Sequence, residues 1–155
     1  MTRWYKYIVI AFLLLSPLAS ASYLNMTSSN DTYVSYSAPN TNYSDSVEGY
    51  IGVTGTATGY MEAYFLFNNI SQLPPFAIVD NATMSLKVSG AGGGGAMGVY
   101  TNMVETSWNT SYLTWNTKPT NSTNINITNM NSITIDRFDI KTGVELIRGG
   151  HANYG

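Results

Sequence analysis

The sequence predicts an all-β fold, a β-sandwich with one short helical segment near the C-terminus. Three observations lead to this prediction. Short stretches rich in Val, Ile, Thr, Tyr and Phe recur along the chain, and clusters of Gly, Pro, Asn and Ser separate them. Two of these stretches alternate apolar and polar side chains with a period of two, as half-buried strands do. A single stretch has helical spacing.

Seven candidate strands follow from this pattern. In the third, Glu62 and Tyr64 lie opposite a face of apolar side chains. In the fourth, Met84, Leu86 and Val88 alternate with polar residues. Strands of this kind form the walls of a sandwich, with one side buried and the other wet. The predicted strands are 31–38, 48–55, 60–67, 82–89, 97–104, 124–129 and 132–138.

The helical candidate is 142–148, where Val144 and Ile147 allow one or two turns before Gly149. A helix this short is not stable alone, so we expect it to pack on the sandwich. The Asn- and Thr-rich stretch 117–131 predicts a long loop that runs into a strand.

The first 21 residues have the features of a secretory signal peptide. Arg3 and Lys6 supply a positive start, 8–15 is an unbroken apolar run, and 19–21 (Ala-Ser-Ala) has the small residues of a cleavage site. The alternative is an uncleaved signal anchor over 4–21, which would tie the protein to a membrane. Because the chain has no cysteine, a lipid anchor on a thiol is excluded.

We therefore expect an exported protein, extracellular or at the cell surface, in three parts. Residues 1–21 form the signal peptide, 22–30 a flexible N-terminal segment and 31–155 one β-sandwich domain. Without cysteines, packing and hydrogen bonds must hold this domain together.

The charge balance argues against two classes of partner. Of the seven basic residues, Arg3 and Lys6 lie in the leader, which leaves five against nine acidic residues. A surface this poor in positive charge binds phosphate groups weakly. Nucleic acid and anionic membrane surfaces are therefore not expected partners.

Eight Asn-x-Ser/Thr sequons fit an exported glycoprotein, in a style that suggests an archaeal surface protein. An Asn-, Ser- and Thr-rich chain also produces such triplets by chance. The candidate acceptors are Asn25, Asn30, Asn42, Asn69, Asn81, Asn109, Asn121 and Asn126.

The stretch 90–95 contains a G-x-G-x-x-G pattern, but a dinucleotide site requires a helix directly after it. Here a predicted strand follows, so we expect a flexible hairpin loop between two strands.

Motifs for catalysis are missing, and we expect no enzyme activity. One histidine, His151, lies in a Gly-rich tail, and no H-E-x-x-H, G-x-S-x-G or Cys nucleophile is present. Spacing alone leaves a glycosidase pair open among scattered carboxylates, which also suit ordinary turn positions. These carboxylates are Asp31, Asp45, Glu48, Asp80, Asp136 and Asp139.

The sequence indicates no cofactor, and a structural calcium ion is one hypothesis. The turn with Asp45 and Glu48 could bring two hard oxygen ligands close to Asp31. The alternative, which the sequence favours, is that all three are solvated turn carboxylates.

Aromatic residues are the most informative part of the composition, with twelve tyrosines and three tryptophans. Aromatic faces fill sandwich cores, and sugars also stack on them through their C–H groups. We expect Trp108 and Trp115 to serve the core or to pin a loop. Tyr33, Tyr50 and Tyr64 stand opposite apolar neighbours, which predicts a wet carbohydrate-binding face.

The order of short motifs resembles the DNRLRE domain family, grouped with carbohydrate-binding module family 96, and the related disaggregatase repeat of methanogenic archaea. The match runs from residue 31 to residue 155. Its motifs are 31–34 (DTYV), 39–43 (PNTNY), 64–67 (YFLF), 70–74 (ISQLP), 82–86 (ATMSL), 99–100 (VY), Trp108, 113–119 (LTWNTKP), 138–140 (FDI) and 153–155 (NYG).

This resemblance implies a jelly-roll-like β-sandwich without catalysis of its own, which binds polysaccharide within a larger surface or polysaccharide-active protein. Two positions depart from the family pattern. Ser44 stands where Gly is usual after Asn-Tyr, and Asn68 stands where Asp is usual after Phe67. A ligand role at either position is not carried over.

Relatives in this family continue into one more strand after the motif at 153–155. Either this chain is a piece of a longer protein or its sandwich lacks the last strand. An open sheet edge exposes unpaired backbone groups and invites self-association. This is the basis of an alternative function, a structural cell-surface subunit that assembles by strand exchange.

Overall fold

The computed structural model describes residues 22–46, 48–53, 59–74, 76–88, 97–120, 122–130 and 135–155. The predicted signal peptide and the Gly-rich stretch 90–95 lie outside the described residues. Within the described part, no helix is both long enough and apolar enough to cross a membrane.

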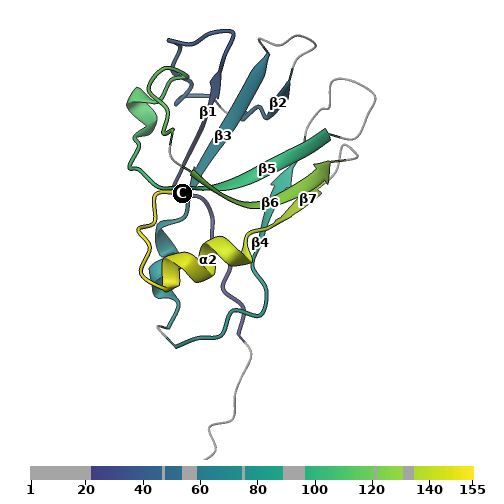
Figure 1. Ribbon diagram of the computed structural model, residues 1–155, viewed down its shortest axis with the longest axis vertical. Coiled ribbons are helices and arrows are strands. Elements are labelled where there is room, and N and C mark those ends of the chain that lie inside the picture. Colours follow the sequence, from purple (N-terminus) through teal and green to yellow (C-terminus); the bar gives the residue numbers. More distant parts are fainter. Residues whose placement is uncertain are drawn as a thin grey trace, which may run out of the picture.

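The chain is mostly β, with three small antiparallel sheets and one short C-terminal helix (Figure 1). The first sheet has the order β1-β3-β2, the second pairs β4 with β7, and the third pairs β5 with β6. The strands are β1 (Asn30–Ser35), β2 (Gly52–Val53), β3 (Tyr60–Leu66), β4 (Thr83–Lys87), β5 (Met97–Val104), β6 (Ser122–Met130) and β7 (Ile135–Asp139). The helical elements are η1 (Asn68–Gln72), η2 (Thr110–Tyr112) and α2 (Lys141–Arg148).

Each predicted strand overlaps an observed strand, and the predicted helix is α2. The jelly-roll arrangement of the sheets stays a prediction. The two short 3-10 helices, η1 and η2, were not expected from the sequence, because they are single turns without apolar periodicity.

The Asn- and Thr-rich stretch 117–131 does run into a strand, as predicted, but β6 (Ser122–Met130) begins two residues before the predicted strand 124–129, so the loop is shorter than expected. The residues of β6 are exposed or half-buried, so its sequence lacks the regular apolar alternation of a strand with one buried face. Its pairing partner stabilises it instead, along a register that runs from Met97↔Met130 to Val104↔Ser122. Cross-strand side chains add to the pairing, since Asn124 Nδ2 donates a 2.9 Å hydrogen bond to Asn102 Oδ1.

The predicted hairpin around 90–95 is wrong. Strands flank the Gly-rich stretch as expected, but β4 pairs with β7 and β5 pairs with β6. The stretch therefore connects two different sheets, and long-range pairing, which local sequence does not encode, decides this.

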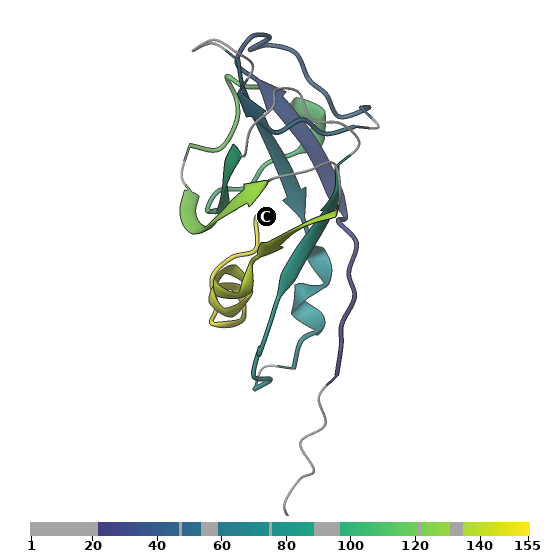
Figure 2. The ribbon, with the colours of Figure 1, turned by 90° about the vertical axis from the view of Figure 1, so that its right-hand side faces the viewer.

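The core has two clusters. The first, which we call the upper cluster, contains Val34, Tyr64, Val104 and Leu113. The partly buried Trp108, Trp115 and Tyr154 pack against it. The lower one contains Ile70, Val79 and Val144, with Ile147 of α2 packed beside them. The helix thus covers the lower cluster, as its single apolar face requires, and Figure 2 shows it beside β4 and β7.

The two alternating strands differ in how they are covered. In β4, Met84 and Leu86 are half-buried between exposed polar residues, as predicted. In β3, Tyr60 is exposed and Glu62 half-buried, but Tyr64 on the same face is buried, and Met61 and Phe65 on the opposite face are half-buried. The expected wet face of β3 is therefore wrong at Tyr64, because segments from elsewhere in the chain pack over that end of the strand.

Candidate functional site

Three tyrosines meet beside β1 and form what we call the tyrosine cluster: Tyr33, Tyr43 and Tyr50. Tyr33 lies on β1, and the other two lie on the loop that connects β1 with β2. The rings of Tyr33 and Tyr43 are stacked with centroids 4.1 Å apart, and the ring of Tyr50 meets Tyr33 edge-on at 5.2 Å. Tyr33 is buried, whereas Tyr50 is 47% exposed. The cluster therefore presents one ring to solvent on a rigid aromatic base.

Hydrogen bonds fix the loop that carries Tyr43. The amide nitrogen of Asn42 donates to the carbonyl oxygens of Thr110 (2.6 Å) and Leu113 (2.8 Å), and its oxygen accepts from Ser44 N (3.1 Å). Nearby, Asn116 N donates to Pro39 O at 3.1 Å. These bonds tie the loop to the η2 segment, so the aromatic rings are positioned before any ligand arrives.

Polar groups lie beside the exposed ring of Tyr50. Its hydroxyl donates a 3.1 Å hydrogen bond to Glu48 Oε2, and Ser46 Oγ donates to Glu48 O at 2.8 Å. The hydrogen bond to Glu48 and the charge of that carboxylate raise the pKa of Tyr50, so its hydroxyl keeps its proton. Burial is the main cause of the raised pKa of Tyr33. A flat ring with carboxylate and hydroxyl groups beside it suits a ligand that is apolar on its face and polar around its rim.

Two of the three tyrosines predicted to form a wet face are buried. Tyr33 and Tyr64 are each 8% exposed, so that prediction is wrong for both. The other two tyrosines of its cluster stand against Tyr33, and the indole of Trp108 covers Tyr64 at 5.6 Å between ring centroids. The predicted set is also divided, because only Tyr33 and Tyr50 contact one another.

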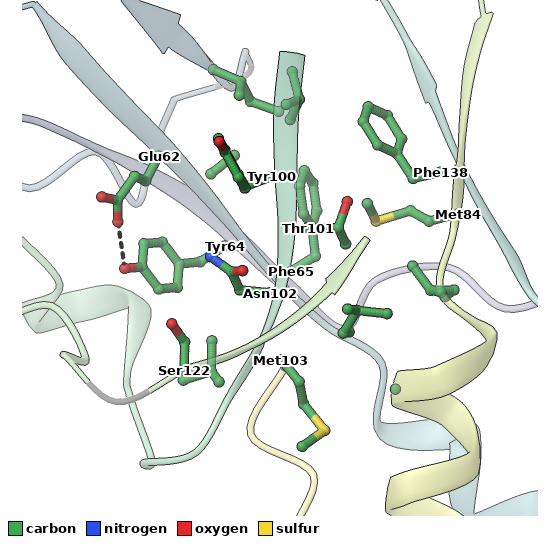
Figure 3. A pocket seen from close by; sticks show the side chains of 18 of the residues that line it. Glu62, Tyr64, Phe65, Met84, Tyr100, Thr101, Asn102, Met103, Ser122 and Phe138 are labelled. Atoms are coloured by element: carbon green, nitrogen blue, oxygen red, sulfur yellow. Dashed lines mark hydrogen bonds between the residues drawn. The ribbon is translucent and has the colours of Figure 1, made fainter. Parts of the chain in front are cut away.

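Tyr64 belongs to a second group of side chains, of which Figure 3 shows Tyr64 and Glu62 of β3 beside a cavity. Its hydroxyl donates a 2.9 Å hydrogen bond to Glu62 Oε2, and Glu62 Oε1 forms an ion pair with Lys118. The Lys118 ammonium lies 3.6 Å from the ring centroid of Trp115. Burial, followed by the charge of Glu62, raises the pKa of Tyr64 well above its usual value. In this group each charge is paired.

The expected structural role of Trp108 and Trp115 is confirmed. Trp108 Nε1 donates to the carbonyl oxygen of Tyr154, and both indoles pack on the upper core cluster. Sequence reasoning missed Tyr43, Lys118 and Tyr36, whose ring meets Trp115 edge-on at 5.3 Å. Tyr43 and Lys118 lie in loops, where no periodicity indicates which side chains meet.

A cavity of about 710 Å³ lies between β3, β5 and α2. Phe65, Met84 and Phe138, from three different strands, contribute to its apolar lining (Figure 3). Glu62 and Lys118 are the charged residues among its described lining, and they pair with one another.

The three carboxylates of the calcium hypothesis do not form a site. Asp31 lies in β1 and accepts a 2.9 Å hydrogen bond from Ser28 Oγ, whereas Asp45 and Glu48 lie in the following loop. Across the part of the chain that the structure describes, no group of three or more His, Asp or Glu side chains could hold a metal ion. The predicted calcium trio is therefore not assembled.

The sequons differ in how available their amides are. Asn42 uses both hydrogens of its amide nitrogen in the two bonds described above, so it is unsuited as an acceptor in the folded protein. Asn126 is half-buried, and Asn121 lies outside the described residues. The exposed candidates are Asn25, Asn30, Asn69, Asn81 and Asn109.

The structure thus describes a small, mostly β domain that presents an aromatic ring on a loop fixed by hydrogen bonds. Comparison with protein families identifies this domain more closely. The chain belongs to carbohydrate-binding module family 96, whose model matches residues 22–148.

Among curated proteins, the chain is similar to three large bacterial relatives. These are the tRNA3(Ser)-specific nuclease WapA of Bacillus spizizenii, the tRNA nuclease WapA of Bacillus subtilis strain 168 and the tRNA(Glu)-specific nuclease WapA of Bacillus subtilis subsp. natto. Each is 28% identical over 141 residues, which cover 84% of this chain and 6% of the relative. The chain thus spans a small fraction of the length of these relatives.

Proposed function

We propose that this chain is a non-catalytic carbohydrate-binding module that attaches to extracellular or cell-surface polysaccharide as part of a larger protein. The membership in carbohydrate-binding module family 96 supports the ligand class. We place the binding site at Tyr50, because its ring is exposed, meets buried Tyr33 edge-on and has Glu48 beside it.

Both stacking and hydrogen bonding would contribute to binding at this site. A pyranose ring would lie on the face of Tyr50 through its C–H groups, which avoids any need to desolvate a charge. Its hydroxyls would then donate to the carboxylate of Glu48 and exchange hydrogen bonds with Ser46. Because the loop is already tied down through Asn42, little ordering entropy is lost on binding.

Nuclease activity is not proposed for this chain. The match with the three nucleases covers 6% of their length, and five basic residues outside the leader give little attraction for phosphate.

We further propose the arrangement that this function requires. Residues 1–21 would be removed on export, and 31–155 would form the binding domain, with its sheets in a jelly-roll sandwich. Part of the predicted flexible segment 22–30 is held by the fold, since Met26 packs on the lower core cluster and Ser29 N donates to Leu66 O at 2.6 Å. The predicted leader and the exposed sequons support an extracellular location.

The test compares two tyrosines of equal exposure. Tyr50→Ala and Tyr60→Ala each remove a ring that is 47% exposed, but only Tyr50 belongs to the tyrosine cluster. Affinity electrophoresis and calorimetry against a panel of neutral and acidic polysaccharides should show binding by the native chain. Tyr50→Ala should weaken this binding about tenfold or more, because an anchoring aromatic commonly contributes ~2 kcal/mol. Equal loss in Tyr60→Ala, or full retention in Tyr50→Ala, would remove the proposed site.

A further inference from the structure

The sheet formed by β5 and β6 has an exposed outer face. Along β5 the buried side chains of Val99 and Met103 alternate with those of Tyr100 and Asn102, which are exposed. Figure 1 shows β5 and β6 side by side, and their register places Tyr100 directly opposite Ile127. Tyr100 is 66% exposed and Ile127 is 52% exposed. A cross-strand pair of apolar side chains therefore stands in solvent on this face.

Asparagine side chains border this apolar pair at both ends. At one end, Asn124 Nδ2 donates the 2.9 Å hydrogen bond to Asn102 Oδ1 across the two strands. At the other end, Asn129 Oδ1 lies over Gly98, since a Cβ on that glycine would come within 3.6 Å of it. Within the described residues, Asn102 Nδ2, Asn124 Oδ1 and the side-chain amide of Asn129 have no hydrogen-bond partner. These five side chains form what we call the β5–β6 outer face: Tyr100, Asn102, Asn124, Ile127 and Asn129.

The strands beneath this face are firmly seated. They pair from Met97↔Met130 to Val104↔Ser122, with one register shift after Thr101. Ile125 of β6 also packs on α2, where its Cδ1 lies 2.6 Å from the position that a Cβ on Gly143 would take. Because the helix has a glycine at this point, β6 can approach it closely. A ligand would thus meet an ordered surface and lose little entropy in binding to it.

The chemistry of the outer face matches a sugar. The ring of Tyr100 and the side chain of Ile127 offer an apolar centre on which the C–H groups of a pyranose can lie. Each asparagine amide can both donate to and accept from sugar hydroxyls at the rim of that ring. A lipid surface would bury these amides without partners, which costs free energy.

The size of the face also argues against a folded protein as its partner. Five residues of each strand span about 17 Å and two strands cover about 10 Å, which gives roughly 170 Å². A stable protein interface buries about 800 Å² on each partner. The face is therefore too small to hold a protein by itself, whereas a short stretch of a sugar chain fits on it.

We propose that the β5–β6 outer face is a second carbohydrate site, with Tyr100 as its stacking ring. The ligand class rests on the proposed function, but the site shares no residue with the tyrosine cluster. In Figure 2, β6 (light green) lies on the left side of the molecule, and the loop after β1 (dark blue), which carries Tyr43, lies on the right. Two sites on different sides let one module bridge two polysaccharide chains, and they raise its avidity for a surface that presents many chains.

NMR titration tests the second site directly. The probes are short partial hydrolysates of each polysaccharide that the native chain retains. Amide shifts should move in two separate groups, one around Tyr50 and one over 98–102 and 124–129. Tyr100→Ala should weaken binding at the second group about tenfold or more and leave the first unchanged, which also shows that the variant is folded. Tyr100→Phe keeps the ring and should bind like the native chain.

The matched control is Tyr112→Ala, which removes a ring that is 76% exposed on η2 and outside both sites. It should leave both groups of shifts unchanged. Light scattering of the soluble polysaccharide should rise when the native chain bridges it, and should not rise with Tyr50→Ala or Tyr100→Ala.

The possible outcomes separate this proposal from the site at Tyr50. Shifts confined to the loop around Tyr50 would overturn the second site and leave the first in place. Shifts on β5 and β6 that persist in Tyr100→Ala would also overturn it. Shifts confined to 98–102 and 124–129 would support the second site and contradict the site at Tyr50. No shift at either surface with any hydrolysate would overturn both.

Discussion

The hydroxyl of Tyr64 donates a 2.9 Å hydrogen bond to Oε2 of Glu62, its neighbour two residues earlier on the same face of β3. The other oxygen of Glu62 pairs with Lys118, which in turn covers Trp115. A buried phenol is thus held between an indole and a carboxylate. Because of this arrangement, we expect the free energy of unfolding to fall at alkaline pH.

The first prediction follows from this arrangement. Burial and the charge of Glu62 raise the pKa of Tyr64 above its reference value of 10.0 in the folded state. Above that pH the unfolded chain releases a proton that the folded chain retains, so the unfolding free energy falls as pH rises. Urea midpoints compared at about pH 8 and about pH 11 should drop less for Tyr64→Phe than for the native chain. Tyr112→Phe, which alters a ring that is 76% exposed, should follow the native chain.

The second prediction concerns the loop that carries Tyr43. Asn42→Ala removes two donated hydrogen bonds and one accepted one, and should lower the unfolding free energy by about 2 kcal/mol. Asn42→Asp should cost more, because a carboxylate would face the carbonyl oxygens of Thr110 and Leu113. Chemical denaturation measures both, and Asn69→Ala, at an exposed sequon, serves as the control. A native-like midpoint for Asn42→Asp would contradict the assigned bonds.

The third prediction separates buried Tyr33 of the tyrosine cluster from exposed Tyr50. Tyr33→Ala should destabilise the fold by about 3 kcal/mol, as deletion of a buried aromatic ring does. Tyr50→Ala should change stability by less than about 1 kcal/mol, since nearly half of its side chain is exposed. Thermal unfolding of both variants tests this. Equal losses would mean that Tyr50 is part of the core and not a ring available to a ligand.

The fourth prediction tests the core beneath the cavity. Phe138 is 1% exposed on β7 and sits opposite Met84 of β4. Phe138→Ala should cost about 3 kcal/mol, at the low end for a buried phenylalanine, because the adjoining cavity already limits its packing. Phe76→Ala, at a position 92% exposed, should stay within about 0.5 kcal/mol of the native chain. Calorimetry distinguishes these outcomes.

About half of the candidate site could be predicted from the sequence. Tyr33 and Tyr50 were identified because strand alternation placed them opposite apolar neighbours. Tyr43 was not, since it lies in a loop, and its stacking on Tyr33 depends on hydrogen bonds that Asn42 makes with residues 110 and 113. Such contacts span roughly seventy positions of sequence, and no local pattern reports them.

The sequence by itself determined the positions of the strands, the short helix and the structural role of the two tryptophans. Period-two alternation in β4 and the paired apolar residues Val144 and Ile147 are local properties, so they can be read without a fold. Low positive charge and the absence of cysteine are properties of composition and need no structure either.

Only the tertiary structure decided which strands pair and which faces are covered. It paired β4 with β7 and β5 with β6, buried Tyr64 under Trp108, and kept Asp31, Asp45 and Glu48 from assembling into a metal site. The physical reason is that burial and pairing depend on whatever segment packs from the far side. An alternating strand shows that it has two faces, but the rest of the chain determines which of them meets water.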